Sequence, residues 1–160
     1  MVVENNITIK ALWVLLEQVP DPEIPVLSIL DLGIVRDIKI QDEQVEIIIT
    51  PTYSGCPAMD AISMDIRLKL IENGFKDVKI TSVLSPAWTT DWMTEEGKIK
   101  LNKYGIAPPK MSGDLSDSPP VCPQCQSADT KLLSQFGSTA CKALYQCNDC
   151  KEPFDYFKCH

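Results

Sequence analysis

Hydrophobic positions in the first hundred residues switch between helical and strand spacing. The first apolar stripe recurs every three or four residues, which is the spacing of one face of a helix. The stripe is made by Leu12, Leu15, Leu16 and Val19. Asn6 or Thr8 can cap the start of this helix, and Pro20 ends it because proline lacks a backbone N–H.

Two strands with period-two hydrophobicity follow, joined by the polar turn 41–44. Alternate residues of a strand point to the same face of a sheet. On the first strand one face carries Ile34, Arg36, Ile38 and Ile40. On the second strand the inner face carries Val45, Ile47 and Ile49.

A second helix begins at Pro57, because proline is favoured at the first helical position, and it ends at Asn73 and Gly74. Its apolar stripe consists of Met59, Ile62, Ile66 and Leu70. Residues 78–84 read as a third strand, and residues 91–104 as a last helix capped by Thr90. The predicted order is αββαβα, a small α+β domain in the form of a two-layer α/β sandwich.

The pattern changes after residue 104. Residues 105–120 are rich in proline, serine and glycine, which predicts a semi-rigid linker between a domain at 1–104 and a module at 121–160. The module has short apolar segments around Leu132, around Leu144 and Tyr145, and at 154–157, with a turn at 136–138. These segments predict a three-stranded, zinc-ribbon-like β module.

Four of the seven cysteines form two CxxC pairs in this module. They are Cys122, Cys125, Cys147 and Cys150. Each pair presents two thiolates from one tight turn, and two such turns supply the closed tetrahedral set of a structural zinc site. Disulfides need an oxidising compartment, for which the sequence offers no argument. An iron–sulfur cluster stays open as an alternative, because Cys141 and Cys159 are possible extra ligands and thiolates suit both metals.

Charge and hydropathy narrow the class of protein. The net charge of −7 repels a phosphate backbone, which disfavours nucleic acid as a partner. No apolar run approaches the ~18 residues of a membrane span, and the N-terminus lacks the features of a secretory signal. We therefore expect a cytoplasmic protein.

Cys56 is the candidate for chemistry outside the CxxC pairs. If Pro57 opens the helix, Cys56 is its N-cap, where backbone N–H groups and the helix dipole favour the thiolate. Asp21 and Glu23 lie in a proline-bounded segment, and they can approach the Cys56 loop as metal ligands or as a general base. A packed thiol and turn-capping carboxylates are the simpler interpretations.

Trp88 and Trp92 lie four residues apart with two threonines between them. Such a pair can line a pocket or a partner surface. We favour the interpretation that it closes a small core.

Six stretches of the chain resemble the PaaD family, a small subunit associated with the bacterial phenylacetyl-CoA 1,2-epoxidase system. They are residues 21–27, 31–36, 50–58, 86–93, 136–145 and 152–159. The N-terminal module alone resembles the wider SufT-type family, whose members assist iron–sulfur protein maturation. In that family function is credited to the positions that correspond to Asp21, Glu23 and Cys56.

The resemblance implies a role in phenylacetate degradation beside other subunits of the epoxidase system. There, oxygen activation belongs to a di-iron subunit and electron supply to an iron–sulfur flavin reductase. This chain has no Glu-x-x-His pair and no glycine-rich nucleotide fingerprint, so the expected role is accessory. The implied work is maturation of the reductase, with iron or a cluster held transiently. The alternatives are a purely structural zinc-ribbon subunit and, more weakly, a thiol redox enzyme using Cys56.

Overall fold

The structure is a computed structural model that describes residues 2–53, 55–110, 118–137, 139 and 141–158. Contacts between Cα atoms divide the chain into two compact units, Met1–Trp88 and Thr89–His160. Among the described residues, no helix combines the length and the apolar character needed to cross a lipid bilayer.

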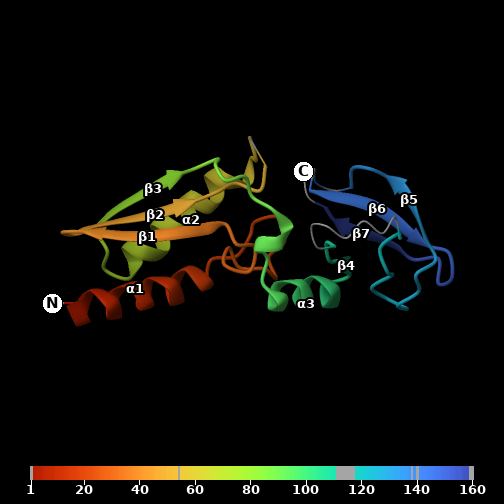
Figure 1. Ribbon diagram of the computed structural model, residues 1–160, viewed down its shortest axis with the longest axis horizontal. Coiled ribbons are helices and arrows are strands. Elements are labelled where there is room, and N and C mark those ends of the chain that lie inside the picture. The colour runs from red at the N-terminus through yellow and green to blue at the C-terminus, as the bar shows by residue number, and fades with distance from the viewer. Residues whose placement is uncertain (1, 54, 111–117, 138, 140, 159–160) are drawn as a thin grey trace. The chain divides into compact units, whose positions relative to one another are not determined.

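The first unit has a three-stranded sheet with two helices (Figure 1). Its elements are α1 (Val2–Glu17), β1 (Val35–Gln41), β2 (Gln44–Ile49), α2 (Ala58–Glu72) and β3 (Asp77–Ser82). β1 and β2 form an antiparallel hairpin, and α2 is the crossover that brings β3 parallel to β2. This order and the mixed α/β fold confirm the prediction from the sequence.

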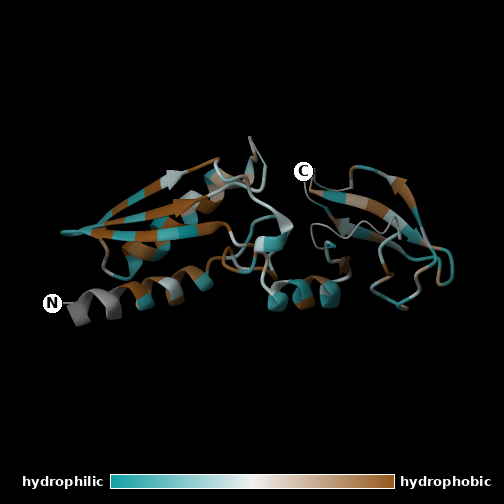
Figure 2. Ribbon diagram, in the orientation of Figure 1, coloured by the Kyte–Doolittle hydropathy of each residue, from teal (hydrophilic) through white to brown (hydrophobic). Residues whose placement is uncertain are grey.

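The core of this unit lies between the helices and one face of the sheet. β2 is the central strand, and Figure 2 shows hydrophobic residues along most of its length. Its inner face buries Val45, Ile47 and Ile49, as predicted from their alternation. The apolar stripe of α2 is also confirmed, and its buried side chains are Ala58, Ile62, Ile66 and Leu70.

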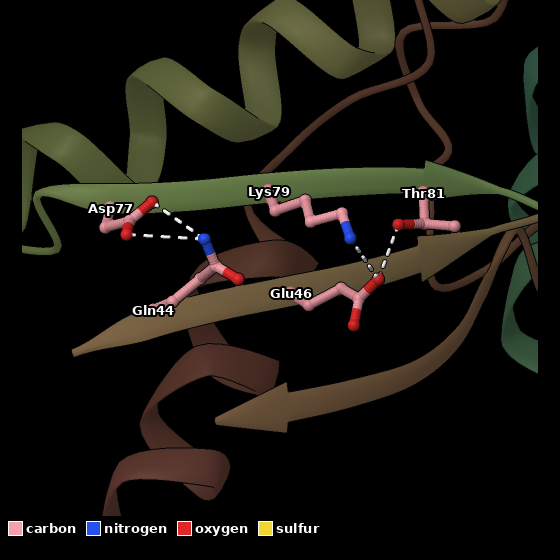
Figure 3. Close-up of polar contacts among 5 residues, drawn as sticks. All are labelled: Gln44, Glu46, Asp77, Lys79 and Thr81. Atoms are coloured by element: carbon pink, nitrogen blue, oxygen red, sulfur yellow. Dashed lines mark hydrogen bonds and ion pairs between the residues drawn. The ribbon is translucent and has the colours of Figure 1, made fainter. Parts of the chain in front are cut away.

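The opposite face of the sheet is polar (Figure 3). Thr81 donates a hydrogen bond of 2.6 Å to Glu46, and Lys79 lies 3.6 Å from the same carboxylate. The hydroxyl of Thr81 and then the charge of Lys79 outweigh desolvation and lower the pKa of Glu46. Gln44 donates to both carboxylate oxygens of Asp77 across the same strand pair. One buried face and one solvated face are typical of a small mixed sheet.

Two details of the first unit differ from the prediction. α1 begins at Val2, so Asn6 and Thr8 lie inside the helix and do not cap it. Both residue types lower helix stability by less than about 0.7 kcal/mol, which is too little to stop a helix that is already formed. In β1 the pairing register shifts between Val35 and Asp37, and this bulge leaves Arg36 exposed while Ile38 is buried.

The second unit contains a four-stranded sheet. Its elements are the 3-10 turn η1 (Thr90–Trp92), α3 (Glu95–Tyr104), β4 (Ile106–Ala107), β5 (Thr130–Ser134), β6 (Lys142–Cys147) and β7 (Pro153–Phe157). β5, β6 and β7 form the predicted antiparallel ribbon. The fourth strand, β4, was not predicted; it pairs in parallel with β7 inside the stretch expected to be a linker.

This fourth strand changes how the chain is divided. Ala107 is buried with Cys122, Cys147 and Phe154 in the core of the ribbon. Packing of Ile106 and Ala107 against the ribbon draws them out of the predicted linker, and α3 contacts β4. The second unit therefore starts at Thr89 and not after residue 104. Residues 111–117 of the predicted linker lie outside the described residues.

The last helix also starts later than expected. Thr90 opens only the 3-10 turn, and the helix proper is capped by Thr94, whose hydroxyl accepts a hydrogen bond of 3.0 Å from the N–H of Gly97. Glu95 and Glu96 follow in the first turn, where the helix dipole favours negative charge. Two candidate caps lie within five residues, and the one followed by acids begins the helix.

Candidate metal centre and the Cys56 loop

The four cysteines of the CxxC pairs come together at one end of the ribbon. Cys122 and Cys125 lie in the turn before β5, whereas Cys147 ends β6 and Cys150 lies in the turn to β7. All four sulfur atoms lie within 4.8 Å of one another. The Sγ atoms of Cys122 and Cys150 are 3.7 Å apart, and those of Cys125 and Cys147 are 3.5 Å apart. A disulfide would need about 2.05 Å, so these are not disulfide bonds.

The separations fit a single tetrahedral ion. With metal–sulfur bonds of about 2.3 Å, the edges of a tetrahedron are about 3.8 Å long. The two measured contacts lie close to that length. The donor set of four thiolates and its geometry therefore suit a closed structural metal centre, which would be held by these four residues.

The two turns, here called the first knuckle (residues 122–126) and the second knuckle (residues 147–151), share one backbone pattern. Gln126 N–H donates to the carbonyl of Cys122 at 2.9 Å, and Lys151 N–H donates to the carbonyl of Cys147 at 3.1 Å. Gln126 and Lys151 both adopt positive φ, at 64° and 68°. This left-handed residue closes each turn so that the sulfurs of one pair face the same point.

The four sulfurs differ in their surroundings. The first cysteine of each pair, Cys122 or Cys147, is fully buried, whereas Cys125 and Cys150 are exposed. The N–H of Cys150 points at the sulfur of Cys147 and lowers the pKa of Cys147 to about 7. Around Cys150 the N–H of Glu152 acts in the same sense, but desolvation and the neighbouring thiols outweigh it and raise the pKa of Cys150 to about 12. Cys147 is therefore the thiol best prepared to lose its proton to an incoming metal ion.

The other predicted ligands do not join this group. Cys141 is buried, and its sulfur lies 3.0 Å from the hydroxyl of Thr139, outside the four-sulfur cluster. Cys159 lies outside the described residues, as does His160.

Three loops of the first unit leave the sheet at one edge. Ile34, just before β1, accepts a hydrogen bond from Thr50, just after β2, and Val83, just after β3, donates to Ile49. Because β2 and β3 are parallel and β1 is antiparallel to β2, this edge carries the end of two strands and the start of the third. Figure 1 shows these connections at the same end of the sheet. The segment with Asp31, the Cys56 loop and the segment leading to Trp88 therefore start from one place.

Cys56 itself is not the helix N-cap. Pro57 occupies that position with helical φ and ψ of −67° and −21°, and no side chain caps α2. Pro57 can take the cap because its ring already imposes this φ, so Cys56 is moved one residue out. The Cys56 side chain is half-buried, its sulfur is 4.0 Å from the hydroxyl of Thr52, and its carbonyl accepts from Met59 N–H. Gly55 precedes it at φ 76°, a conformation that favours glycine.

The predicted acidic residues shape their own turns. Asp21 is buried, and its Oδ1 accepts the N–H groups of Glu23 at 2.9 Å and Ile24 at 2.7 Å. Asp31 is also buried; its Oδ2 accepts from Ser28 N–H, while Ser28 Oγ accepts from Asp31 N–H. These bonds make the acidic segment rigid. Glu23 is half-buried.

Trp88 closes this edge of the core. Its side chain is buried, and its indole N–H donates to the carbonyl of Leu32 at 2.7 Å. This contact ties the segment after β3 to the segment before β1. The interpretation of Trp88 as a core residue is confirmed for this side chain.

Sequence patterns did not single out Thr50. It begins the Cys56 loop, is 1% exposed, and among the described residues its Oγ1 is the buried side-chain oxygen or nitrogen without a hydrogen-bond partner. A threonine after a run of isoleucines is ordinary in a strand, so nothing in the sequence signals this.

Comparison with known proteins decides the family. The PaaD zinc beta ribbon domain matches residues 107–158, and the iron-sulfur cluster assembly protein family matches residues 9–82. A protein of Escherichia coli (strain K12), provisionally named as one of the subunits of 1,2-phenylacetyl-CoA epoxidase, is 52% identical over 94% of this chain and 93% of its own length. The chain belongs to the PaaD family.

Other similarities cover the first unit of this PaaD family member. The "Fe-S protein maturation auxiliary factor" of Porphyromonas gingivalis is 39% identical over 54% of this chain and 84% of its own length. A crystal structure of a DUF59 domain from Bacillus anthracis matches with a TM-score of 0.54 at 30% identity, over 57% of this chain and 89% of that chain. The expected similarity of the N-terminal module to maturation proteins is confirmed, and so is its fold.

Proposed function

We propose that this protein is an accessory factor of the phenylacetyl-CoA epoxidase system that matures the iron–sulfur cluster of the reductase component. Iron or a cluster is the cargo, handled by Cys56 with Asp21 or Glu23. The C-terminal ribbon holds a structural zinc ion and docks the client. Membership of the PaaD family and the match of residues 9–82 to iron–sulfur assembly proteins support an accessory role.

One observation carries the proposal. The Cys56 loop leaves the sheet edge from which the segment before β1 also departs, so a half-exposed thiol and a rigid acidic turn belong to the same loop cluster. A thiol and carboxylates are ligands that iron accepts. The turn that holds Asp21 is fixed by its own hydrogen bonds, so ordering it for a ligand costs little entropy.

The test is co-expression of the reductase component with the wild-type protein, with Cys56→Ser, or with Met64→Ala as the matched control. Met64 is exposed on α2, so its loss should change nothing. We expect Cys56→Ser to lower the iron and sulfide content of the purified reductase and its activity in step. Full cluster occupancy with Cys56→Ser would refute the maturation role.

A second candidate function is a purely structural subunit whose ribbon holds the components together. The four-sulfur centre favours it, because a metal-stapled ribbon is a rigid docking module. On this alternative Cys56 has no role, and Cys147→Ser loses assembly.

Pull-downs of the epoxidase components with the two single variants separate the candidates. Maturation predicts that Cys56→Ser still binds the reductase and yet leaves it without a cluster. A structural subunit predicts that Cys56→Ser supports full activity, whereas Cys147→Ser neither binds nor supports it.

A further inference from the structure

The two knuckles are held by different means, although their backbone patterns match. Pro123 is the second residue of the first knuckle, and its ring restricts the backbone there. Asn148 occupies the equivalent place in the second knuckle. Proline has no N–H to donate, so a hydrogen bond from this position is available only to the second knuckle.

Asn148 uses this freedom to reach across to the chain that follows the first knuckle. Its backbone N–H donates to the carbonyl of Asp129 at 2.8 Å, and its side-chain Nδ2 donates to Oδ1 of the same residue at 2.8 Å. Both ends of Asn148 are therefore bound by one partner. We call this double contact the Asp129–Asn148 clasp.

A second strut runs beside the clasp. Ser127 Oγ donates to the carboxylate of Asp149 in the second knuckle and accepts from the N–H of Asp129 at 3.1 Å. Asp129 thus takes part in both links between the two knuckles. The link from Asp129 to Asn148 continues the ladder of β5 and β6, in which Thr130 is paired with Cys147.

The clasp stands where the metal centre is open. Cys125 and Cys150 are exposed, whereas Cys122 and Cys147 are buried under the ribbon core. An ion held between two knuckles leaves when they separate on the exposed side, because the buried sulfurs are fixed by the sheet. A contact that joins the knuckles slows that separation.

We propose that Asp129 is a positioning residue of the metal centre: it holds the second knuckle against the first and thereby slows loss of the ion. Groups that orient metal ligands from outside the coordination shell commonly change metal affinity by about 10- to 100-fold. This inference concerns the ribbon alone and does not depend on the role of Cys56.

The experiment measures zinc release from the full chain to a chromophoric chelator. Asp129→Ala should release zinc about tenfold faster than the wild-type protein, and Asn148→Ala should match it. Asp129→Asn keeps a side-chain oxygen for Asn148, so it should restore most of the slow rate. Glu152→Ala is the charge-matched control, since it removes a nearby exposed acid whose side chain is not part of the clasp.

Two further measurements separate positioning from loss of folding. Cobalt(II) absorption should show an unchanged tetrahedral S4 spectrum in each variant, with one ion per chain. The double variant Asp129→Ala/Asn148→Ala should release zinc no faster than either single variant, because both remove one link. If Asp129→Ala and Asn148→Ala release zinc within twofold of Glu152→Ala, the proposal is wrong.

Discussion

The two units of this protein solve the same problem of stability with different materials. The first unit buries aliphatic side chains from two helices and a sheet, among them Leu16, Ile47 and Ile66 at 0% exposure. In the core of the second unit, Cys122 and Cys147 take the place that aliphatic residues occupy in the first, beside Phe154. A small sheet with so few large apolar residues needs a staple, and the four sulfurs supply it.

The comparison teaches where each unit is vulnerable. The first unit depends on packing, so its stability falls in proportion to the volume removed from its core. The second depends on one ion, so its folding is coupled to metal binding and to deprotonation of the thiols. The following predictions order these differences by size.

Removing the metal should have the largest effect. Chelation, or the substitution Cys147→Ser, should unfold the ribbon strands while the first unit keeps its structure, because structural zinc contributes about 10–16 kcal/mol to small zinc-binding folds. Two-dimensional NMR of the full chain checks this, since amide signals of residues 130–157 should collapse and those of residues 35–82 should persist. Cys141→Ser is the control, because that sulfur lies outside the cluster. Loss of signals from both units would show that their stabilities are coupled.

A core truncation in the first unit should have the next largest effect. Ile66→Ala removes a fully buried side chain of α2 and should lower the free energy of unfolding of this unit by about 2–5 kcal/mol. Met64→Ala, on the exposed face of the same helix, should change it by less than about 0.5 kcal/mol. Urea unfolding followed by circular dichroism, with zinc content measured in parallel, tests both. Zinc loss from Ile66→Ala would contradict the independence of the two units.

The smallest expected change is a gain. Thr50 buries a hydroxyl without a partner among the described residues, so Thr50→Val removes a polar group that water would otherwise solvate. We expect the first unit to gain about 1 kcal/mol, seen as a rise in Tm of roughly 4–8 °C by calorimetry. Thr50→Ser keeps the hydroxyl and should show no such gain. A lower Tm for Thr50→Val would mean that the hydroxyl is satisfied in solution.

Local patterns in the sequence determined the secondary structure and the metal ligands. The alternation of Val45, Ile47 and Ile49 specifies a half-buried strand by itself, because side chains of a strand point to alternate faces. The CxxC spacing specifies two metal-binding turns by itself, because two thiolates from one tight turn reach one ion.

Only the tertiary structure decided which distant segments meet. Ile106 and Ala107 became a strand because β7 offered a free edge, and Asn148 found its partner in Asp129 because β5 and β6 align. At Cys56, Pro57 took the cap position that the spacing assigned to the cysteine. Such outcomes follow from contacts between residues far apart in the chain and from competition for one position, and a local pattern of hydrophobic and polar residues carries neither.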